Sequence, residues 1–177
     1  MDDLTPQTEP TPQMRAKRPA NPLAGPYGHP IHPLLVTVPI GAWVASFVFD
    51  IIGFVADDPT PYAVASRVLI LIGLIGAALA AVFGLIDASH ITHGTRARRT
   101  VMIHLSVNLA VTALFLVNLL IRWLTEPERI SVIGFILTIV GLVALSFSGW
   151  LGGKMVYRYG VRVADEATQR EGFVPDR

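Results

Sequence analysis

The sequence predicts an all-α integral membrane protein, an antiparallel up-and-down four-helix bundle with both termini in the cytoplasm. Hydrophobic residues make up 52% of the 177 residues and charged residues only 15%, whereas a soluble domain is about 25% charged. Most of the charges lie at the ends and in short connections, and four long apolar runs lie between them. Each run has roughly 20 residues, the length that a helix needs to cross a hydrocarbon layer of about 30 Å.

Polar tails are expected on both sides of one transmembrane domain, residues 29–163. Residues 1–28 are rich in Pro, Thr and Gln and show no helical or strand period, so we expect this N-terminal tail to be disordered. Residues 164–177 are expected to form the polar C-terminal tail.

The first two spans are expected at about residues 34–56 and 62–86. Pro33 suits the first turn of a helix, where a missing N–H costs little, and the residue before it is biased away from helical angles. Pro39 lies within the first span and is expected to kink it. An acidic turn, Asp57-Asp58-Pro59, separates the two spans.

The last two spans are expected at about residues 101–124 and 130–151, with an acidic turn between them. Short connections predict that neighbouring helices are antiparallel. Small residues gather on one face of two spans, and small residues let membrane helices approach closely. These faces are Gly73, Ala77, Ala80 and Gly84 in the second span, and Gly134, Thr138, Gly141, Leu145, Ser148 and Gly152 in the fourth. We interpret them as interior seams of the bundle; a homo-oligomer interface is the alternative.

Basic residues fall on alternate connections, which predicts the orientation. One side of the bundle carries Arg15, Lys17, Arg18, Arg96, Arg98, Arg99, Lys154, Arg158 and Arg162. The other side carries the acidic turns and few arginines. The positive-inside rule therefore places both termini and the 87–100 connection in the cytoplasm. The formal net charge is only +1 and no basic face is visible, so the expected partner is the lipid bilayer and not nucleic acid.

A polar stripe marks the third span. At about 100° per residue, its members fall within an arc of about 120°; they are His104, Asn108, Thr112, Phe115, Asn118 and Arg122. Such a stripe is expected to face the bundle interior or a cavity. Asp50 in the first span needs a partner at that depth, and Arg67 or Arg122 can form an ion pair with it. A proton-carrying role for Asp50, and snorkelling of Arg67 to the headgroups, are alternatives.

All five histidines map to the predicted cytoplasmic end: His29, His32, His90, His93 and His104. Neutral imidazole is a ligand for metals and for haem iron. The set His32, Asp87 and His104 can hold a divalent metal, and His32 and His104 can supply ligands to a b-type haem, oriented by His29 and Asn108. The alternative is that these histidines only cap or cross-link helices. The sequence has no cysteine, which excludes cysteine-ligated iron–sulfur clusters and c-type haem attachment.

Two segments are distinctive together: residues 28–36, Gly-His-Pro-Ile-His-Pro-Leu-Leu-Val, and residues 149–161, Gly-Trp-Leu-Gly-Gly-Lys-Met-Val-Tyr-Arg-Tyr-Gly-Val. Between them stand Pro39-Ile40-Gly41, Phe49-Asp50, Gly84-Leu85-Ile86-Asp87 and His104-Leu105-Ser106-Val107-Asn108. Over residues 28–163 the chain resembles the bacterial membrane family called domain of unknown function 2231.

The resemblance implies a four-helix protein of the bacterial inner membrane. Some relatives are fused to Rieske-type iron–sulfur domains, which implies a redox setting; a Rieske-type partner here would be a separate chain, because this sequence lacks the cysteines. By motif position, the residues carried over are His29, His32, Asp50, Asp87, His104, Asn108 and residues 149–161. Lys154 is a departure, because relatives tend to have an acidic residue there.

Three functions are compatible with these patterns. The leading hypothesis is a non-enzymatic membrane module that binds haem or a metal at its histidine cluster and serves electron transfer. The second is a structural or assembly subunit of a membrane complex without a cofactor. The third is proton or ion transport through a polar path that includes Asp50, although no internal repeat typical of transporters is visible. No catalytic triad, phosphate loop or paired-carboxylate site is visible.

Overall fold

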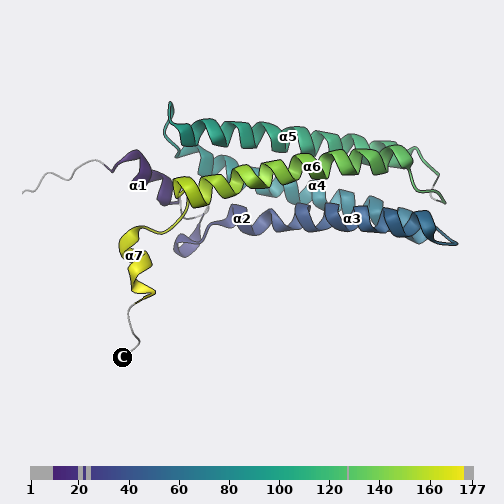
Figure 1. Cartoon of the computed structure of the whole chain (residues 1–177), viewed down its shortest axis with the longest axis horizontal. Coiled ribbons are helices and arrows are strands. Elements are labelled where there is room, and N and C mark those ends of the chain that lie inside the picture. The colour runs from purple at the N-terminus through teal and green to yellow at the C-terminus, as the bar shows by residue number, and fades with distance from the viewer. Residues whose placement is uncertain (1–9, 20–21, 23–24, 127, 174–177) are drawn as a thin grey trace, which may run out of the picture.

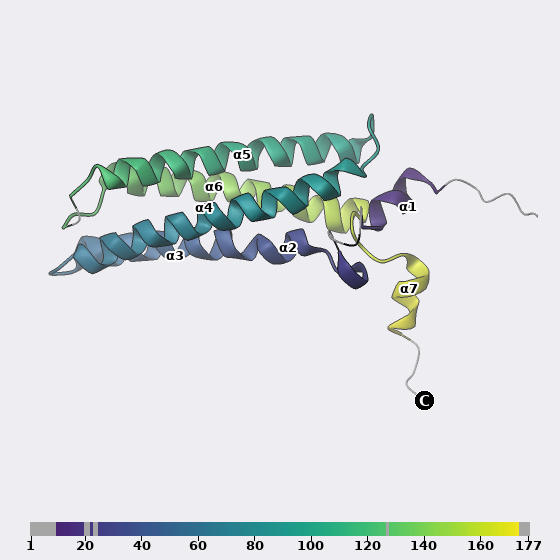
Figure 2. The same ribbon diagram turned by 180° about the vertical axis from the view of Figure 1, so that it is seen from behind.

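The computed structural model describes residues 10–19, 22, 25–126 and 128–173 of the chain. The regular structure in these residues is helical, and four long helices lie side by side (Figures 1 and 2). The connections between them alternate between the two ends of the bundle, so consecutive helices run in opposite directions. Each long helix has the length and hydropathy to cross a membrane. The predicted all-α fold with four such helices is therefore confirmed.

The first span consists of two helices, α2 (Ile31–Leu35) and α3 (Thr37–Val55). It begins slightly before the expected residue 34, because Pro33 falls in the first turn, where a missing N–H leaves no bond unmade. The helix is interrupted at Val36. Pro39 has no N–H to donate to the carbonyl one turn earlier, so the interruption lies next to the position where the sequence predicts a kink.

The second and third spans extend beyond the apolar runs. Helix α4 (Thr60–Ser89) begins where the side chain of Asp58 accepts a hydrogen bond from the Thr60 N–H at 3.0 Å. Helix α5 (Arg96–Trp123) begins after Thr95, whose hydroxyl accepts a hydrogen bond from the Arg98 N–H at 3.1 Å. The apolar pattern marks the part that lipid surrounds, whereas the Asp58 turn before α4 and the Thr95 N-cap of α5 mark where these helices begin.

The fourth span is α6 (Val132–Gly153), which continues as a single π-helical turn, η2 (Lys154–Arg158). Ser131 caps its start by accepting a hydrogen bond from the Gly134 N–H at 3.1 Å. We call the end of the bundle formed by residues 28–32, 88–104 and 148–163 the histidine end, and the opposite end the distal end.

The terminal segments meet at the histidine end, where Figure 1 shows both α1 (Pro12–Lys17) and α7 (Glu166–Glu171). Ala16 of α1 is buried in an apolar cluster with Ala88, Ile91, Val101 and Val161. Residues 12–17 belong to the tail that the sequence predicts to be disordered, and here they form a helix whose start is capped by the side chain of Thr11. Residues 1–9 of that tail lie outside the described residues.

Two ion pairs join the terminal segments to each other and to the bundle. Lys17 Nζ lies 2.9 Å from Glu166 Oε1, and Arg162 Nε lies 3.1 Å from Asp87 Oδ1. The backbone N–H of Arg162 also donates to the carbonyl of Ala16 at 2.9 Å. The N- and C-terminal segments thus form one cap over the histidine end.

The small residues of α4 and α6 lie inside the bundle, as the sequence predicts. A Cβ added at Gly73 would collide with the ring of Trp43, and one at Gly141 would lie 2.6 Å from Cε2 of Phe115. Trp43 and Phe115 are themselves stacked, with ring centroids 4.0 Å apart and 7° between their planes. Glycine is therefore needed where these rings press against the neighbouring helix. Many large apolar side chains of the four helices point outward instead, which is the surface that lipid would cover.

Candidate functional site

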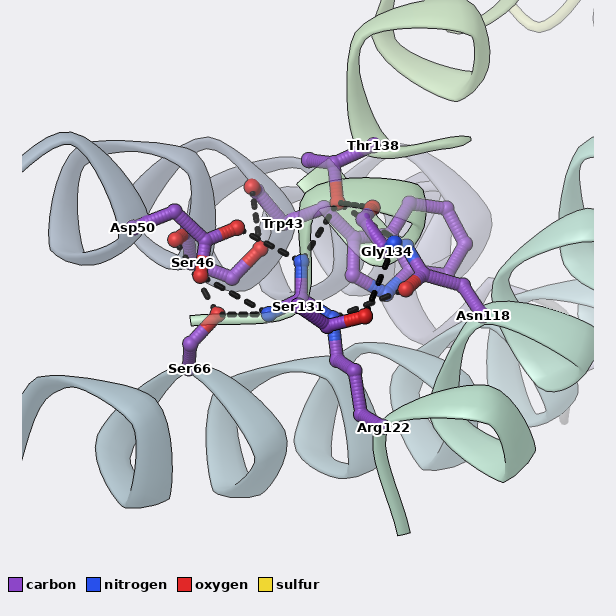
Figure 3. Close-up of polar contacts among 9 residues, drawn as sticks. All are labelled: Trp43, Ser46, Asp50, Ser66, Asn118, Arg122, Ser131, Gly134 and Thr138. Carbon is purple, nitrogen blue, oxygen red and sulfur yellow. Dashed lines mark hydrogen bonds and ion pairs between the residues drawn. The ribbon is translucent and has the colours of Figure 1, made fainter. Parts of the chain in front are cut away.

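Asp50 and Arg122 form a bidentate ion pair inside the distal half of the bundle (Figure 3). Nη1 of Arg122 donates to Oδ1 of Asp50 at 2.8 Å, and Nη2 donates to Oδ2 at 2.6 Å. Asp50 on α3 is 0% exposed and Arg122 on the last turn of α5 is 2% exposed. Burying two charges is costly, so the pair is stable only if the remaining hydrogen-bonding groups are also satisfied.

Arg122 uses all of its donors. The guanidinium carries five N–H groups, and two of them go to Asp50. Nε donates to Oδ1 of Asn118 at 2.8 Å, Nη1 donates to Oγ of Ser66 at 3.1 Å, and Nη2 donates to Oγ1 of Thr138 at 3.2 Å. The ion pair is thus surrounded by polar groups from all four spans.

The neighbouring hydroxyl and amide groups are satisfied too. Asn118 donates to Thr138 at 2.9 Å, and Thr138 donates to the carbonyl of Gly134 at 2.9 Å. Ser66 donates to the carbonyl of Ser46 at 3.2 Å. A Cβ at Gly134 would lie 2.7 Å from Nε of Arg122, so α6 can approach this network only through a glycine. A closed network of this kind fixes how the four helices pack.

Arg67 does not join the ion pair. Its Nη2 donates to the carbonyl of Thr125 at 2.9 Å and to that of Glu126 at 3.3 Å. These carbonyls lie at the C-terminal end of α5, where a cation also interacts favourably with the helix dipole. Of the two arginines proposed as partners of Asp50, the structure brings only Arg122 to it.

An apolar layer separates this network from the histidine end. It consists of Trp43, Ile70, Val111, Phe115 and Leu119, all at most 2% exposed. Along α5, His104 and Arg122 are about 27 Å apart at about 1.5 Å per residue. The polar stripe of α5 is therefore divided into two separate polar sites.

His32 and His104 face each other at the histidine end, with ring centroids 6.4 Å apart and ring planes at 85°. His32 reaches this position from α2 by packing over Gly84 of α4, where an added Cβ would lie 2.9 Å from Nδ1. Nδ1 of His32 lies 2.8 Å from the carbonyl of Ala80. A carbonyl only accepts hydrogen bonds, so Nδ1 carries the proton and the neutral ring has its lone pair on Nε2.

His104 has the same tautomer for the same reason. Its Nδ1 lies 3.0 Å from the carbonyl of Ser148, and its Nε2 lies 3.1 Å from Nδ2 of Asn108. The Asn108 amide also donates to Oγ of Ser148 at 2.6 Å. The imidazole is thus held on both sides by α5 and α6, and its Nε2 lone pair points at the Asn108 amide.

Asp87 does not complete a three-ligand set with these histidines. Its carboxylate pairs with Arg162, and both side chains are nearly buried. Within the described ranges, no group of three or more His, Asp or Glu side chains is placed to hold a metal ion. The carboxylate of Asp87 is thus paired with Arg162 of the C-terminal segment, a partner that the sequence pattern does not associate with it, and a metal site at His32, Asp87 and His104 stays a prediction.

The other histidines lie at the surface. His29, His90 and His93 are all exposed, and Nδ1 of His90 lies 3.0 Å from Oγ of Ser89. His29 precedes α2, and among the described residues no hydrogen bond or ring contact joins it to His104. Of the five histidines at this end, two face each other inside the bundle and three lie at the surface.

Several residues of both polar sites were not singled out as site residues on the sequence. Ser66 and Ser148 sit among apolar neighbours, where a small hydroxyl is common and carries little signal. Thr138, Gly134 and Ser148 were recognised as a small-residue face of α6, but a small face alone does not predict which polar side chains will use it. Ser46 falls on the same face of the first span as Asp50, as helical spacing predicts.

The fold and the outward apolar surface define a class, the four-span helical membrane proteins, with one buried ion-pair network and one histidine pair. The chain belongs to the family described as predicted membrane protein (DUF2231), whose profile matches residues 28–165. This confirms the resemblance found on the two terminal motifs. No curated protein and no solved structure matches the chain.

Proposed function

We propose that the chain is a membrane module that binds one transition-metal ion through Nε2 of His32 and Nε2 of His104, and that this ion serves electron transfer. One observation carries the proposal. Both rings donate Nδ1–H to a backbone carbonyl and keep a lone pair on Nε2, and the two ring centroids lie 6.4 Å apart. Histidines that ligate metals use their other ring N–H in this way, which fixes the tautomer and the ring orientation.

The residues fit a single metal ion better than a haem. In the folded chain, the amide of Asn108 already occupies the Nε2 position of His104 that a haem iron would need. A small ion would also have to displace this amide, which donates to the carbonyl of His104 at 2.9 Å and to Oγ of Ser148 at 2.6 Å, but it needs far less space between the helices than a porphyrin ring does. Two imidazoles suit copper, iron, nickel or zinc, and copper or iron would supply the one-electron chemistry. The remaining coordination positions would be filled by water or by a partner.

The surrounding residues would hold the two ligands in place. Ser148 accepts from His104, Ala80 accepts from His32, and the closed Asp50–Arg122 network keeps the four helices in register. Exposed His29 lies near the start of α2, and we keep it as a candidate second-sphere residue. The electron-transfer partner would be a separate redox protein of the Rieske type, as the family resemblance implies.

The proposed setting is the bacterial inner membrane, with both termini in the cytoplasm. The supporting observation is the distribution of basic residues, which concentrate at the histidine end and are few at the distal end. Fusion of a periplasmic-active reporter to either terminus should give no activity, whereas a fusion in the 125–129 connection should be active.

Metal titration of the purified full chain tests the function. After chelator treatment, the wild type should take up about one copper or iron ion per chain, and the His32→Ala/His104→Ala variant should take up none. His90→Ala/His93→Ala is the matched control, because both residues are exposed at the same end of the bundle. Equal uptake by the wild type and the His32/His104 variant would exclude this site.

A structural or assembly subunit without a cofactor is the second candidate. The observation that favours it is the full use of Arg122's donors, which gives the network no free group for chemistry. A structural role predicts that the His32→Ala/His104→Ala variant folds and assembles with its membrane complex as the wild type does. A metal-free wild type, purified from cells supplied with copper and iron, would favour it.

A further inference from the structure

Two open cavities adjoin each other at the histidine end, between α1, the connection before α5 and the segment after η2. The first has a volume of about 310 Å³ and the second about 520 Å³. Gln13, Arg158 and Tyr159 line both of them. The floor of the first cavity is formed by apolar groups, among them Ala16, Ile91 and Val161.

Arg158 provides an uncompensated positive charge at the boundary of the two cavities. Its side chain is exposed, and it forms no ion pair or hydrogen bond within the part of the chain that the structure describes. Two nearby carboxylates already have cationic partners, Glu166 with Lys17 and Asp87 with Arg162. Further basic residues at this end raise the local positive potential: Arg15, Arg18, Arg96, Arg98 and Arg99.

Aromatic side chains place Arg158 at the depth of the lipid headgroups. Trp150 near the end of α6 is 60% exposed, and Tyr157 in η2 is 91% exposed. Nζ of Lys154 lies 5.5 Å from the ring centroid of Trp150 and 5.9 Å from that of Tyr159. Exposed Trp and Tyr with flanking basic residues mark the membrane–water interface of a spanning helix.

We propose that Arg158 binds the phosphate of an anionic phospholipid in the cleft that it shares with Gln13 and Tyr159. The planar guanidinium can donate two parallel hydrogen bonds to a phosphate. Trp150 and Tyr157 lie on the same helix end, where they can cover the glycerol and upper acyl segments of the bound lipid. The site is separate from the histidine pair, because within the described part of the chain its residues form no hydrogen bond, ion pair or ring contact with His32 or His104.

Retention of lipid by the intact chain tests the proposal. The full-length protein is purified from bilayers that contain phosphatidylcholine and phosphatidylglycerol, and the lipids that stay bound are measured by native mass spectrometry. The wild type should retain phosphatidylglycerol over phosphatidylcholine, and Arg158→Gln should weaken this retention by about fivefold, as expected for the loss of one basic residue at a membrane surface. Arg129→Gln, an exposed arginine at the distal end, is the matched control and should leave the retention unchanged.

Two outcomes would overturn the proposal. One is equal retention of phosphatidylglycerol by the wild type and Arg158→Gln, with helix content and elution volume confirming that both are folded. The other is displacement of the lipid by inorganic phosphate at ordinary buffer concentration, which would identify the site as one for a free anion. Persistence of the bound lipid in phosphate buffer, together with its loss in Arg158→Gln, would support a lipid site.

Discussion

The guanidinium of Arg122 and the carboxylate of Asp50 meet in two parallel hydrogen bonds of 2.8 and 2.6 Å, although the residues are 72 positions apart in the sequence. Every other N–H of Arg122 is bonded to a side chain from α4, α5 or α6. The pair therefore links the four spans, and its removal should destabilise the whole bundle.

Replacing one member of the pair should destabilise the fold strongly. In Arg122→Leu the carboxylate of Asp50 stays buried without a partner, which costs about 3–5 kcal/mol. The free energy of unfolding in detergent should fall by that amount. The double variant Asp50→Leu/Arg122→Leu should recover part of the loss, because no charge is left buried. Unchanged stability of Arg122→Leu, equal to that of the exposed control Arg129→Leu, would contradict this role.

Two glycines of α6 should respond oppositely to the same substitution. Gly141→Ala places a methyl group 2.6 Å from Phe115, whose ring is fixed by stacking on Trp43, and should destabilise the protein by about 1–3 kcal/mol. Gly149→Ala meets nothing within 4 Å and should be neutral or stabilising by up to about 1 kcal/mol. Thermal unfolding of the two variants distinguishes them, and an equal loss would mean that α6 is oriented differently.

Docking of the terminal segments should depend on pH. The hydrogen bond from Lys17 lowers the pKa of the Glu166 carboxyl. The hydrogen bond that Asp165 accepts from the backbone N–H of Thr168 lowers the pKa of the Asp165 carboxyl. A carboxyl whose pKa is lowered by folding stabilises the folded form above its ordinary pKa of about 4, and this contribution disappears as the pH falls through the lowered value.

Hydrogen exchange of the backbone amides of α7 measures whether this helix is docked. Protection of α7 should be constant from neutral pH to about pH 5 and should decrease below about pH 4. Lys17→Met removes the partner, so its α7 should be less protected at neutral pH and should show a smaller change on acidification. Equal protection in Lys17→Met and the wild type at neutral pH would show that the Lys17–Glu166 pair does not hold α7.

We expect no proton conductance through the isolated bundle. The side chains of Trp43, Ile70 and Phe115 are buried between the two polar sites, and among the described side chains no chain of hydrogen bonds links Asp50 with His104. Proteoliposomes that contain the wild type or Asp50→Asn should acidify at the same rate as empty vesicles. Faster flux that depends on Asp50 would favour the transport function instead.

Much of the fold could be predicted because lipid imposes simple requirements on a sequence. Apolar length located all four spans, and helical spacing placed Asn118 and Arg122 on an interior face. The choice between Arg67 and Arg122 as the partner of Asp50 was not predictable, since both lie at a similar depth. It depends on which helix face each arginine occupies after packing, and the carbonyls at the end of α5 engage Arg67 instead.

The histidine end was harder to predict because its geometry depends on contacts far apart in the sequence. The pairing of His32 with His104 follows from how α2 packs on α4 and α5 on α6, and spacing within one helix contains no such information. Asp87 was expected to ligate a metal, but Arg162 reaches it through the turn after η2, where Gly160 and Arg162 have positive φ values of 65° and 59°. The docking of α1 on this end depends on one buried apolar side chain, Ala16, and on polar contacts with the distant C-terminal segment, which the sequence pattern does not reveal.

X-ray absorption spectroscopy of the metal-loaded protein tests the histidine pair most directly. With copper or iron bound, the spectrum should show two imidazole ligands with metal–nitrogen distances of about 2.0 Å, and these should be absent from the His32→Ala/His104→Ala variant. Such a result would establish that the two Nε2 atoms bind the metal. A spectrum without imidazole scattering, or one that is identical in the variant, would contradict the account and leave the bundle as a structural module.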